Sequence, residues 1–277
     1  KTTPKIAYAS VLFGQTPQET FEIGKNIKNK NFKAIKFGWQ NFGANINLDE
    51  EHMIAARDGV GKDMHLMIDV GAIWGTNVEE ASKRTKIFND ANIAWLEEPF
   101  FSDAFFEYSE LSNLTNIPLA GGESCHSIES AKNMIRYGKV KFIQIDAGIA
   151  GGILAGKEIF DFAEKNDVQY VNHTFTSHLQ LSASLQPYAN SSKSIYAEFP
   201  QQLKPLAWDL TTNHIEMDQD GYITAFDVEV TSVPHSSRPG TGGTPNLRSA
   251  VLIKNSKLPA KSPDVPAIRG GGAERNA

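Results

Sequence analysis

The chain has one cysteine in 277 residues and no apolar run long enough to span a membrane. The single cysteine, Cys125, excludes an internal disulfide framework and is typical of a protein from a reducing compartment. A membrane span needs about 18 or more consecutive apolar residues, and the first residues, KTTPKIAYAS, also lack the apolar core of a secretory signal. We therefore expect a cytoplasmic protein with no membrane partner.

Basic residues are also not in excess. Lys and Arg number 27 against 32 Asp and Glu, which gives a net charge of -5 and argues against a nucleic-acid partner. Hydrophobic residues make up 40% of the chain, as in a globular protein with a sizeable core, and the length suffices for one large domain or two ordinary ones. A cytoplasmic enzyme is the class of protein most consistent with these bounds.

Apolar segments that end in a polar side chain recur along the sequence. In IAWLEEPF, residues 93–100, the apolar run passes directly into Glu97 and Glu98. Such runs are typical of buried strands, and two carboxylates at the end of a buried strand need a positive partner. Successive runs end roughly 25 residues apart, which is enough for one strand, one helix and two loops. The side chains at these ends are Lys36, Asp69, Glu97, Glu123, Asp146, His173 and Glu198.

The intervening segments carry the signals of helices. Thr16 and Glu19 have the spacing of a capping box, and Thr76 with Glu79 repeats the pattern. Alternation of such helices with apolar strands predicts a parallel sheet over residues 5–200. Eight strands can be placed, near residues 5–12, 33–38, 65–70, 93–97, 117–122, 141–146, 168–173 and 194–199.

The predicted fold class is α/β, a (β/α)7β barrel of the TIM type, because eight parallel strands are present without a clear eighth helix. The alternative is an open, doubly wound sheet, which needs a glycine-rich phosphate turn after its first strand. VLFGQTPQ, residues 11–18, is a poor match to such a turn. In a barrel all the polar strand ends meet at the carboxyl-terminal face, where barrel enzymes hold their active sites.

Three of the polar ends are acids on successive strands: Asp69, Glu97 and Glu123. Carboxylates that meet need a counter-charge, and ligand sets made only of oxygen favour a hard cation such as Mg²⁺. The alternative for any one of these acids is a helix cap or a solvated loop position. Their occurrence at three successive strand ends favours a shared metal site.

Asp146 and His173 end the sixth and seventh strands, which are neighbours in a barrel. A carboxylate beside an imidazole orients the ring and raises its basicity, so this pair is a candidate general base. Lys36 ends the second strand, on the opposite side of the predicted site. The alternatives are a capping or packing role for His173 and a surface position beside Lys33 for Lys36.

Five motifs in order resemble those of the mandelate racemase/muconate lactonizing enzyme group of the enolase superfamily: MIDVG, WLEEP, AGGES, IQIDAGIAGGI and VNH. The resemblance covers roughly residues 5–200 and depends on the ordered set rather than on any single motif. It implies that Asp69, Glu97 and Glu123 bind Mg²⁺, with Glu98 behind them or in a structural role.

The group usually carries Lys-x-Lys on its second strand, whereas FKAIKFGW has Lys36 with Ala34 before it and Gly38 after it. Loss of one lysine removes a like charge that would lower the pKa of the other. Lys36 is therefore expected to be a protonated, electrostatic or proton-donating group rather than a base. Glu198 resembles the acid that faces the substrate carboxylate in racemases of the group, and in protonated form it would hydrogen-bond an enediolate. The alternative for Glu198 is an ordinary acid at the rim.

The resemblance implies abstraction of the proton alpha to a carboxylate, with an enediolate stabilised by Mg²⁺. We expect dehydration of a sugar acid in which His173 takes the proton or helps hydroxide to leave. A racemase or epimerase needs a base on each face of the carbon and is the alternative if Lys36 is neutral. An inactive metal-binding barrel fragment is a further alternative. The expected partners are a small-molecule carboxylate and further copies of the chain in a homo-oligomer.

Members of the group normally have a capping domain before the barrel, and this chain starts near its first predicted strand. We therefore expect a catalytic barrel in residues 1–204 and a remnant of the return segment to the capping domain in residues 205–227. Residues 228–277 are rich in Pro, Gly and Ser, which predicts a disordered tail.

Overall fold

The computed structural model describes residues 2–201 and 204–226. The described residues up to Phe226 form one compact unit. The predicted tail, residues 228–277, lies outside the described residues, and the domain boundary predicted at residue 204 stays a prediction. None of the described helices is both long and apolar enough to cross a bilayer.

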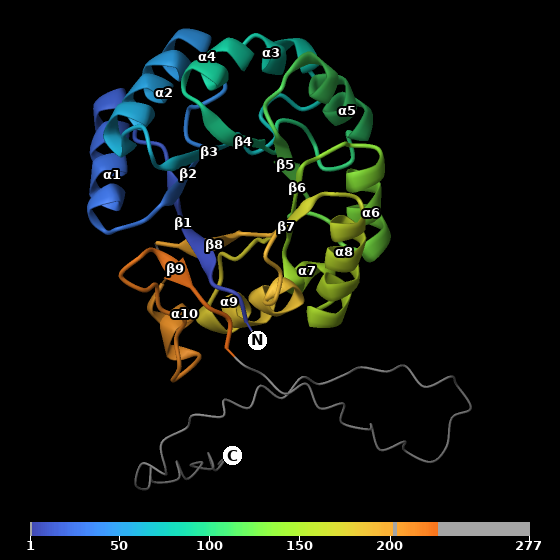
Figure 1. Ribbon diagram of the computed structural model, residues 1–277. Helices are drawn as coiled ribbons and strands as arrows, with labels where there is room; N and C mark the ends of the chain where they lie inside the picture. Colours follow the sequence, from blue (N-terminus) through green and yellow to red (C-terminus); the bar gives the residue numbers. More distant parts are fainter. Residues whose placement is uncertain (1, 202–203, 227–277) are drawn as a thin grey trace, which may run out of the picture. The chain divides into compact units, whose positions relative to one another are not determined.

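Eight parallel strands form a barrel wall, and helices surround it (Figure 1). The strands lie in the order β7-β6-β5-β4-β3-β2-β1-β8, so each is beside its sequence neighbour and the last returns to the first. This order confirms the barrel and rules out the doubly wound sheet, in which the strand order reverses. The strands are β1 (Lys5–Leu12), β2 (Ala34–Gly38), β3 (His65–Asp69), β4 (Ile93–Glu97), β5 (Leu119–Gly121), β6 (Phe142–Ile145), β7 (Gln169–Asn172) and β8 (Tyr196–Pro200).

Several helices begin at a residue whose side chain caps them. Thr16 accepts a hydrogen bond from the backbone N–H of Glu19, as its capping-box position predicts. The helix after β3 differs by one residue, because Asn77 and not Thr76 caps it and accepts from the N–H of Glu80. The helices are α1 (Pro17–Asn29), α2 (Ile46–Val60), α3 (Val78–Ser82), α4 (Thr85–Asp90), α5 (Phe105–Leu114), α6 (Ile128–Arg136), α7 (Ala147–Ala150), α8 (Ile153–Lys165), α9 (His178–Leu185) and α10 (Pro205–Asp209), with a 3-10 turn η1 (Gln186–Tyr188).

The barrel interior changes from apolar to polar along the strands. An inner apolar cluster fills the barrel, and the ring of Trp95 contacts those of Phe142 and Tyr196 at centroid distances of 4.7 and 5.4 Å. Alternate residues of a strand face the same side, so the next inward side chains after these three rings are Glu97, Gln144 and Glu198. The complete cluster is Tyr8, Ala34, Met67, Trp95, Ala120, Phe142, Val171 and Tyr196.

Closure between β7 and β8 depends on a side chain. Within the described residues β8 forms a backbone ladder with β1 and none with β7. Instead, the carboxamide of Asn172 accepts from the N–H of Glu198 (3.0 Å) and donates to its carbonyl oxygen (3.3 Å). The Tyr188 hydroxyl lies 2.7 Å from Asn172 Oδ1, which supports that carboxamide. The Asn172 side chain thus replaces a peptide group in the ladder.

The segment after β8 returns to the amino-terminal end of the barrel. Strand β9 (Tyr222–Ile223) pairs antiparallel with Lys5 and Ile6 at the start of β1. Ile223 and Ala225 are buried there, so this segment adds to the apolar core. Its interpretation as a return segment to a capping domain stays a prediction.

Candidate functional site

A cavity of about 420 Å³ opens at the carboxyl-terminal ends of the strands. This size falls in the range of small-molecule sites. The position is the face at which the sequence places the polar strand ends. The lining residues are Ser10, Val11, Leu12, Lys36, Gly38, Trp39, Asp69, Glu123, His173 and Phe175.

Lys36 supplies the positive charge that the acidic strand ends need. Its ammonium nitrogen is 2.5 Å from Glu97 Oε1, 3.0 Å from Glu198 Oε1 and 3.7 Å from Asp69 Oδ2. Lys36 is 3% exposed, so the alternative of a surface lysine is wrong. Burial by itself lowers the pKa of Lys36, but the carboxylates of Glu198 and Glu97 outweigh it and raise that pKa well above its ordinary value. The Lys36 side chain is therefore cationic.

Neither neighbour of Lys36 on the same face of β2 is a second lysine. Ala34 packs in the inner apolar cluster below the site. Gly38 lies against Asp69, and a Cβ atom at this glycine would stand 3.3 Å from Asp69 Oδ2. A longer side chain at this position would press on the carboxylate.

The acids predicted to bind a metal lie at this end of the barrel. Asp69 and Glu97 are register partners on β3 and β4, and Glu123 follows β5. Asp69 accepts hydrogen bonds from the Trp39 indole (3.2 Å) and the Gly71 N–H (2.9 Å). Burial and the Glu97 carboxylate raise the pKa of Asp69 to about 8, and burial also raises the pKa of Glu123.

The donor set fits a hard divalent cation in its chemistry. Asp69, Glu97 and Glu123 offer only oxygen donors, and such donors suit Mg²⁺. In the part of the chain that the structure describes, no three His, Cys, Asp or Glu side chains are grouped closely enough to form a metal cluster. The Lys36 ammonium contacts two of the predicted ligands, Asp69 and Glu97. The three acids thus lie at the carboxyl-terminal end of the barrel, but they do not surround a common point as metal ligands do.

Glu98 differs from its neighbour Glu97 in its backbone conformation. Its φ of 42° lies in the left-handed region, which is uncommon for a residue with a side chain. Glu98 is buried, and burial together with the charge of Glu123 raises its pKa to about 9. The pKa of Asp69 is raised in the same way, so the backbone conformation and not the pKa distinguishes Glu98 from the acids proposed for the metal.

The two residues of the predicted dyad, Asp146 and His173, directly follow β6 and β7 and contact each other. His173 Nδ1 is 2.9 Å from Asp146 Oδ2, and His173 Nε2 is 3.4 Å from Glu123 Oε2. The other oxygen of Asp146 accepts from Gln180 Nε2 (2.6 Å) and from the Gly148 N–H (2.8 Å), so the carboxylate is fixed on both sides. His173 therefore has one nitrogen held by Asp146 and the other directed toward the acids.

The charges around His173 decide its protonation. Burial lowers the pKa of the ring, but the hydrogen bond to Asp146 and the charges of Glu198 and Glu123 outweigh it and raise the pKa to about 9. Burial opposes ionisation of Asp146 as well, yet its hydrogen bond to His173 lowers the pKa of that carboxyl. In this arrangement the ring is cationic at neutral pH and can donate a proton. It becomes a base only after that proton has left.

Glu198 lies beneath Lys36 and does not line the cavity. Its Oε2 accepts from the Thr174 N–H at 2.7 Å. Burial opposes its ionisation, but Lys36 and His173 outweigh this and lower the pKa of Glu198 below its usual range. The protonated form, which would donate to an enediolate, is therefore not the form that this arrangement favours.

Sequence reasoning missed two buried polar side chains in the same interior. Tyr8 is fully buried, lies beside Glu198 in the β1–β8 register and has its ring centroid 5.7 Å from the Lys36 nitrogen. Gln144 is 1% exposed, and neither polar atom of its carboxamide has a hydrogen-bond partner among the described residues. A signal was present for Gln144, a polar residue within the apolar strand FIQI and two residues before Asp146.

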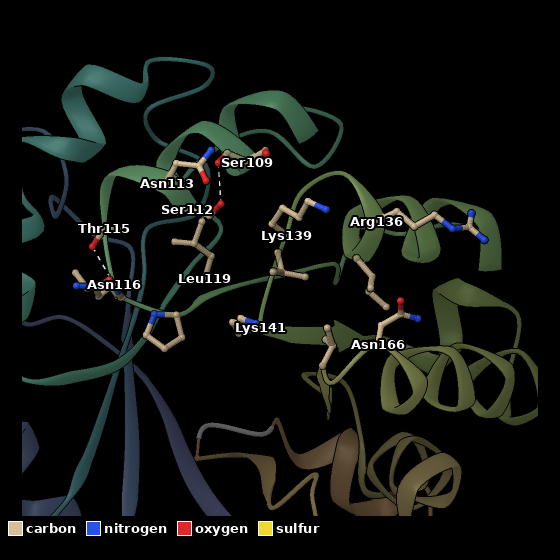
Figure 2. A pocket seen from close by; sticks show the side chains of 15 residues that line it. Ser109, Ser112, Asn113, Thr115, Asn116, Leu119, Arg136, Lys139, Lys141 and Asn166 are labelled. Carbon is tan, nitrogen blue, oxygen red and sulfur yellow. Dashed lines mark hydrogen bonds between the residues drawn. The ribbon is translucent and has the colours of Figure 1, made fainter.

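A second cavity, of about 870 Å³, lies at the opposite end of the barrel, between α5, α6 and the starts of β5 and β6 (Figure 2). Its walls carry serine, asparagine and three cations, Arg136, Lys139 and Lys141. All three cations are exposed. The buried acids and the imidazole belong to the smaller cavity, which is the candidate active site.

Both curated proteins and solved structures include relatives of this chain. L-talarate/galactarate dehydratase of Salmonella typhimurium is 28% identical over 159 residues, which cover 56% of this chain and 39% of that protein. D-galactarolactone cycloisomerase of Agrobacterium fabrum is 31% identical over 144 residues, which cover 52% of this chain and 38% of that protein. The chain therefore spans less than half the length of these curated relatives.

A solved structure gives a closer match over more of the fold. A protein from Rhodobacter sphaeroides, described as a predicted mandelate racemase, has 42% sequence identity and a TM-score of 0.78. That match covers 80% of this chain and 57% of the other chain, which confirms the resemblance to the mandelate racemase group. Residues 22–250 match the model of a family described as enolase C-terminal domain-like. Because this match extends over more than half of the sequence, the chain belongs to the enolase C-terminal domain-like family.

Proposed function

We propose that this chain carries the barrel of a Mg²⁺-dependent enzyme that removes the proton alpha to a carboxylate, with dehydration of a sugar acid as the outcome. The observation that carries the proposal is the meeting of Asp69 and Glu123 with Lys36 and His173 around one cavity. The names of the relatives support the substrate class, since one is a talarate/galactarate dehydratase and another a galactarolactone cycloisomerase.

The chemistry explains why these residue types are needed together. A hydrogen alpha to a carboxylate is weakly acidic, and its removal concentrates charge on the two oxygens of an enediolate. Mg²⁺, when bound, supplies positive charge that stabilises those oxygens more in the transition state than in the ground state. Asp69, Glu97 and Glu123 are the residues that would hold it. Lys36, which lines the same cavity, adds a second fixed positive charge.

His173 is the proposed proton carrier. In its neutral form the ring nitrogen Nε2 takes the alpha proton, while Asp146 holds Nδ1 and stabilises the imidazolium that forms. The same proton then passes to the hydroxyl group on the beta carbon as the carbon–oxygen bond breaks. The products are water and an enol, so a single residue on one face of the substrate serves both steps.

Racemisation is the second candidate, because the Rhodobacter sphaeroides structure is described as a predicted mandelate racemase. A racemase needs a base on each face of the carbon, and Lys36 would have to be the second one. The carboxylates around Lys36 raise its pKa, which makes the ammonium a poor base. This argues for the one-sided reaction.

The test is exchange of the alpha proton in D₂O with Mg²⁺ over a panel of sugar acids and hydroxy acids. Exchange with release of water supports the dehydratase, and inversion of configuration supports the racemase. Absence of exchange over the whole panel, with Mg²⁺ bound, would contradict both and favour a metal-binding barrel without turnover. Lys36→Met separates the first two outcomes, because a racemase would lose interconversion while one stereoisomer still exchanged.

A further inference from the structure

The Lys36 ammonium shares its carboxylates with the proposed metal site. It contacts Glu97 Oε1 at 2.5 Å and lies 3.7 Å from Asp69 Oδ2. The side chains of Lys36, Glu97 and Asp69 are only 4%, 0% and 9% exposed, so water screens these charges poorly. A metal cation bound to Glu97 Oε1 or Asp69 Oδ2 would be repelled by the Lys36 ammonium nearby.

A divalent cation and this ammonium would compete for the same oxygens. Mg²⁺ binds oxygen at about 2.0–2.1 Å and demands near-octahedral geometry around itself. An ammonium group at hydrogen-bond distance from Glu97 Oε1 fills that direction and repels a second cation at short range. The Lys36 side chain would therefore have to leave Glu97 and Asp69 for the metal to bind them.

Glu198 is a carboxylate with which Lys36 can stay paired when a metal binds the other acids. Its Oε1 is 3.0 Å from the ammonium, and it is not among the three acids proposed for the metal. The Thr174 N–H fixes the other oxygen of this carboxylate, and Lys36 is the one cation among the described residues that contacts Oε1. Of the three carboxylates near Lys36, Glu97 and Asp69 are also proposed metal ligands, whereas Glu198 is not.

We propose that Lys36 and a divalent cation are alternative occupants of the Glu97 and Asp69 carboxylates, and that Lys36 withdraws to Glu198 when the cation binds. The proposal rests on the metal ligands named under the proposed function and adds a role for Lys36 to it. Lys36 is then the internal counter-ion of the acidic cluster, and cation binding fixes where its ammonium stands in the cavity.

The experiment is calorimetric titration of the full chain with MgCl₂, comparing wild type with Lys36→Met. Removal of the competing ammonium should tighten Mg²⁺ binding by about tenfold or more. His173→Asn is the comparison variant, because it removes a positive charge that contacts one proposed ligand, Glu123, and neither Glu97 nor Asp69. Its Mg²⁺ affinity should rise by less than that of Lys36→Met, because one ligand and not two loses a competing charge.

Three results would overturn the proposal, each for a different reason. Equal or weaker binding in Lys36→Met would show that Lys36 does not compete with the metal. Equal tightening in Lys36→Met and His173→Asn would show a general effect of charge and no shared place. Absence of Mg²⁺ binding in all the proteins would overturn the metal assignment itself, and the proposed function with it.

Thermal unfolding supplies a second measurement if Lys36→Met is unstable. Without Lys36, the buried carboxylates Glu97 and Glu198 lose their counter-ion, so the melting temperature should fall in the absence of Mg²⁺. Saturating Mg²⁺ should then raise the melting temperature of the variant by more than that of the wild type. Lys36→Gln should behave in the same way, and an equal rise in variant and wild type contradicts the proposal.

Discussion

The two ends of the barrel each hold a buried lysine, and the partners of the two lysines differ. At the carboxyl-terminal end, Lys36 faces Glu97 and Glu198, which raise its pKa. At the amino-terminal end, Lys5 donates to the carbonyl oxygen of Ser191 at 2.5 Å, and burial lowers its pKa to about 8. No carboxylate among the described residues lies within 4 Å of the Lys5 ammonium. A buried lysine therefore indicates a charged site only when its partners are also charged.

The cavities at the two ends of the barrel also differ in whether their ionisable groups are buried or exposed. The larger cavity, at the amino-terminal end, is lined by exposed cations (Figure 2), whereas the smaller one holds the buried acids and the imidazole. The volume of a cavity therefore does not identify the candidate active site in this protein. Buried ionisable groups that shift one another's pKa values are the stronger guide.

The sharpest test of this contrast replaces two residues at the carboxyl-terminal end and one at the amino-terminal end. His173→Asn should lower alpha-proton exchange by about a hundredfold to ten-thousandfold, since general-base removal costs roughly 3–5 kcal/mol of barrier. Asp146→Asn should cause a smaller loss, because the ring would keep its place and lose its orienting charge. Lys139→Met, in the wall of the larger cavity, should leave the exchange rate unchanged. Wild-type exchange in His173→Asn would end the dyad hypothesis.

Metal binding should distinguish the two adjacent acids at the end of β4, Glu97 and Glu98. Glu97→Gln should weaken Mg²⁺ binding by about a hundredfold or more, because it removes a proposed ligand. Glu98→Gln should weaken it by less than about tenfold, since Glu98 follows β4 with a left-handed backbone and is not a proposed ligand. Calorimetric titration of both variants decides the matter. The reverse order would assign the ligand to Glu98, and an unaltered affinity in Glu97→Gln would remove Glu97 from the metal site.

The closure between β7 and β8 should matter more for folding than the walls of the larger cavity. Asn172→Ala removes the hydrogen bonds to Glu198 and leaves buried backbone groups unpaired, at a cost of about 2–4 kcal/mol in the free energy of unfolding. Asn113→Ala, an exposed residue of the larger cavity, should change it by less than about 0.5 kcal/mol. Urea unfolding measures both, and equal effects would mean that the closure does not depend on Asn172.

The smallest effect is expected for Lys5. Burial of an ammonium without a counter-ion destabilises the fold, so Lys5→Met should raise the free energy of unfolding at pH 7 by about 1 kcal/mol. The folded pKa of about 8 lies below the ordinary value of 10.5. Between these two pH values the unfolded chain holds more protons, so this group makes stability rise with pH.

The advantage of the Lys5→Met variant over wild type should therefore shrink from pH 7.5 to pH 9.5, in urea unfolding at the two pH values. Only the difference between the two proteins is interpreted, because other groups titrate in the same window. A constant difference would show that Lys5 has an ordinary pKa in the folded protein.

Much of the fold was predictable because apolar runs and helix caps are local signals. The eight strands, their parallel order and the polar ends at one face follow from spacing and from the single face at which parallel strands end. The Asn77 cap was missed because Thr76, beside it, has an equally suitable side chain for the same role. Local sequence does not decide between two adjacent capping residues.

The sequence predicted which residues form the site better than it predicted which of their charged groups contact one another. The dyad was anticipated because Asp146 and His173 end adjacent strands, and their 2.9 Å contact is confirmed. The partners of Lys36 were not, because its long side chain can reach acids on several strands and only the assembled barrel brings Glu198 beneath it. The bridge made by Asn172 also depends on the final placement of β8. The roles of these residues in catalysis and metal binding stay predictions.

The unequal attachment of β8 has a consequence for motion in the barrel. This strand is laddered to β1 on one edge, while its other edge is joined to β7 through the Asn172 carboxamide. A strand held by one ladder can separate transiently without unfolding the remaining wall, so the amides of β8 should exchange with deuterium sooner than those of β3, which has ladders on both edges. Each such opening would move Glu198 away from the site. The rate at which this edge opens would therefore also limit how long the ion pair between Lys36 and Glu198 lasts.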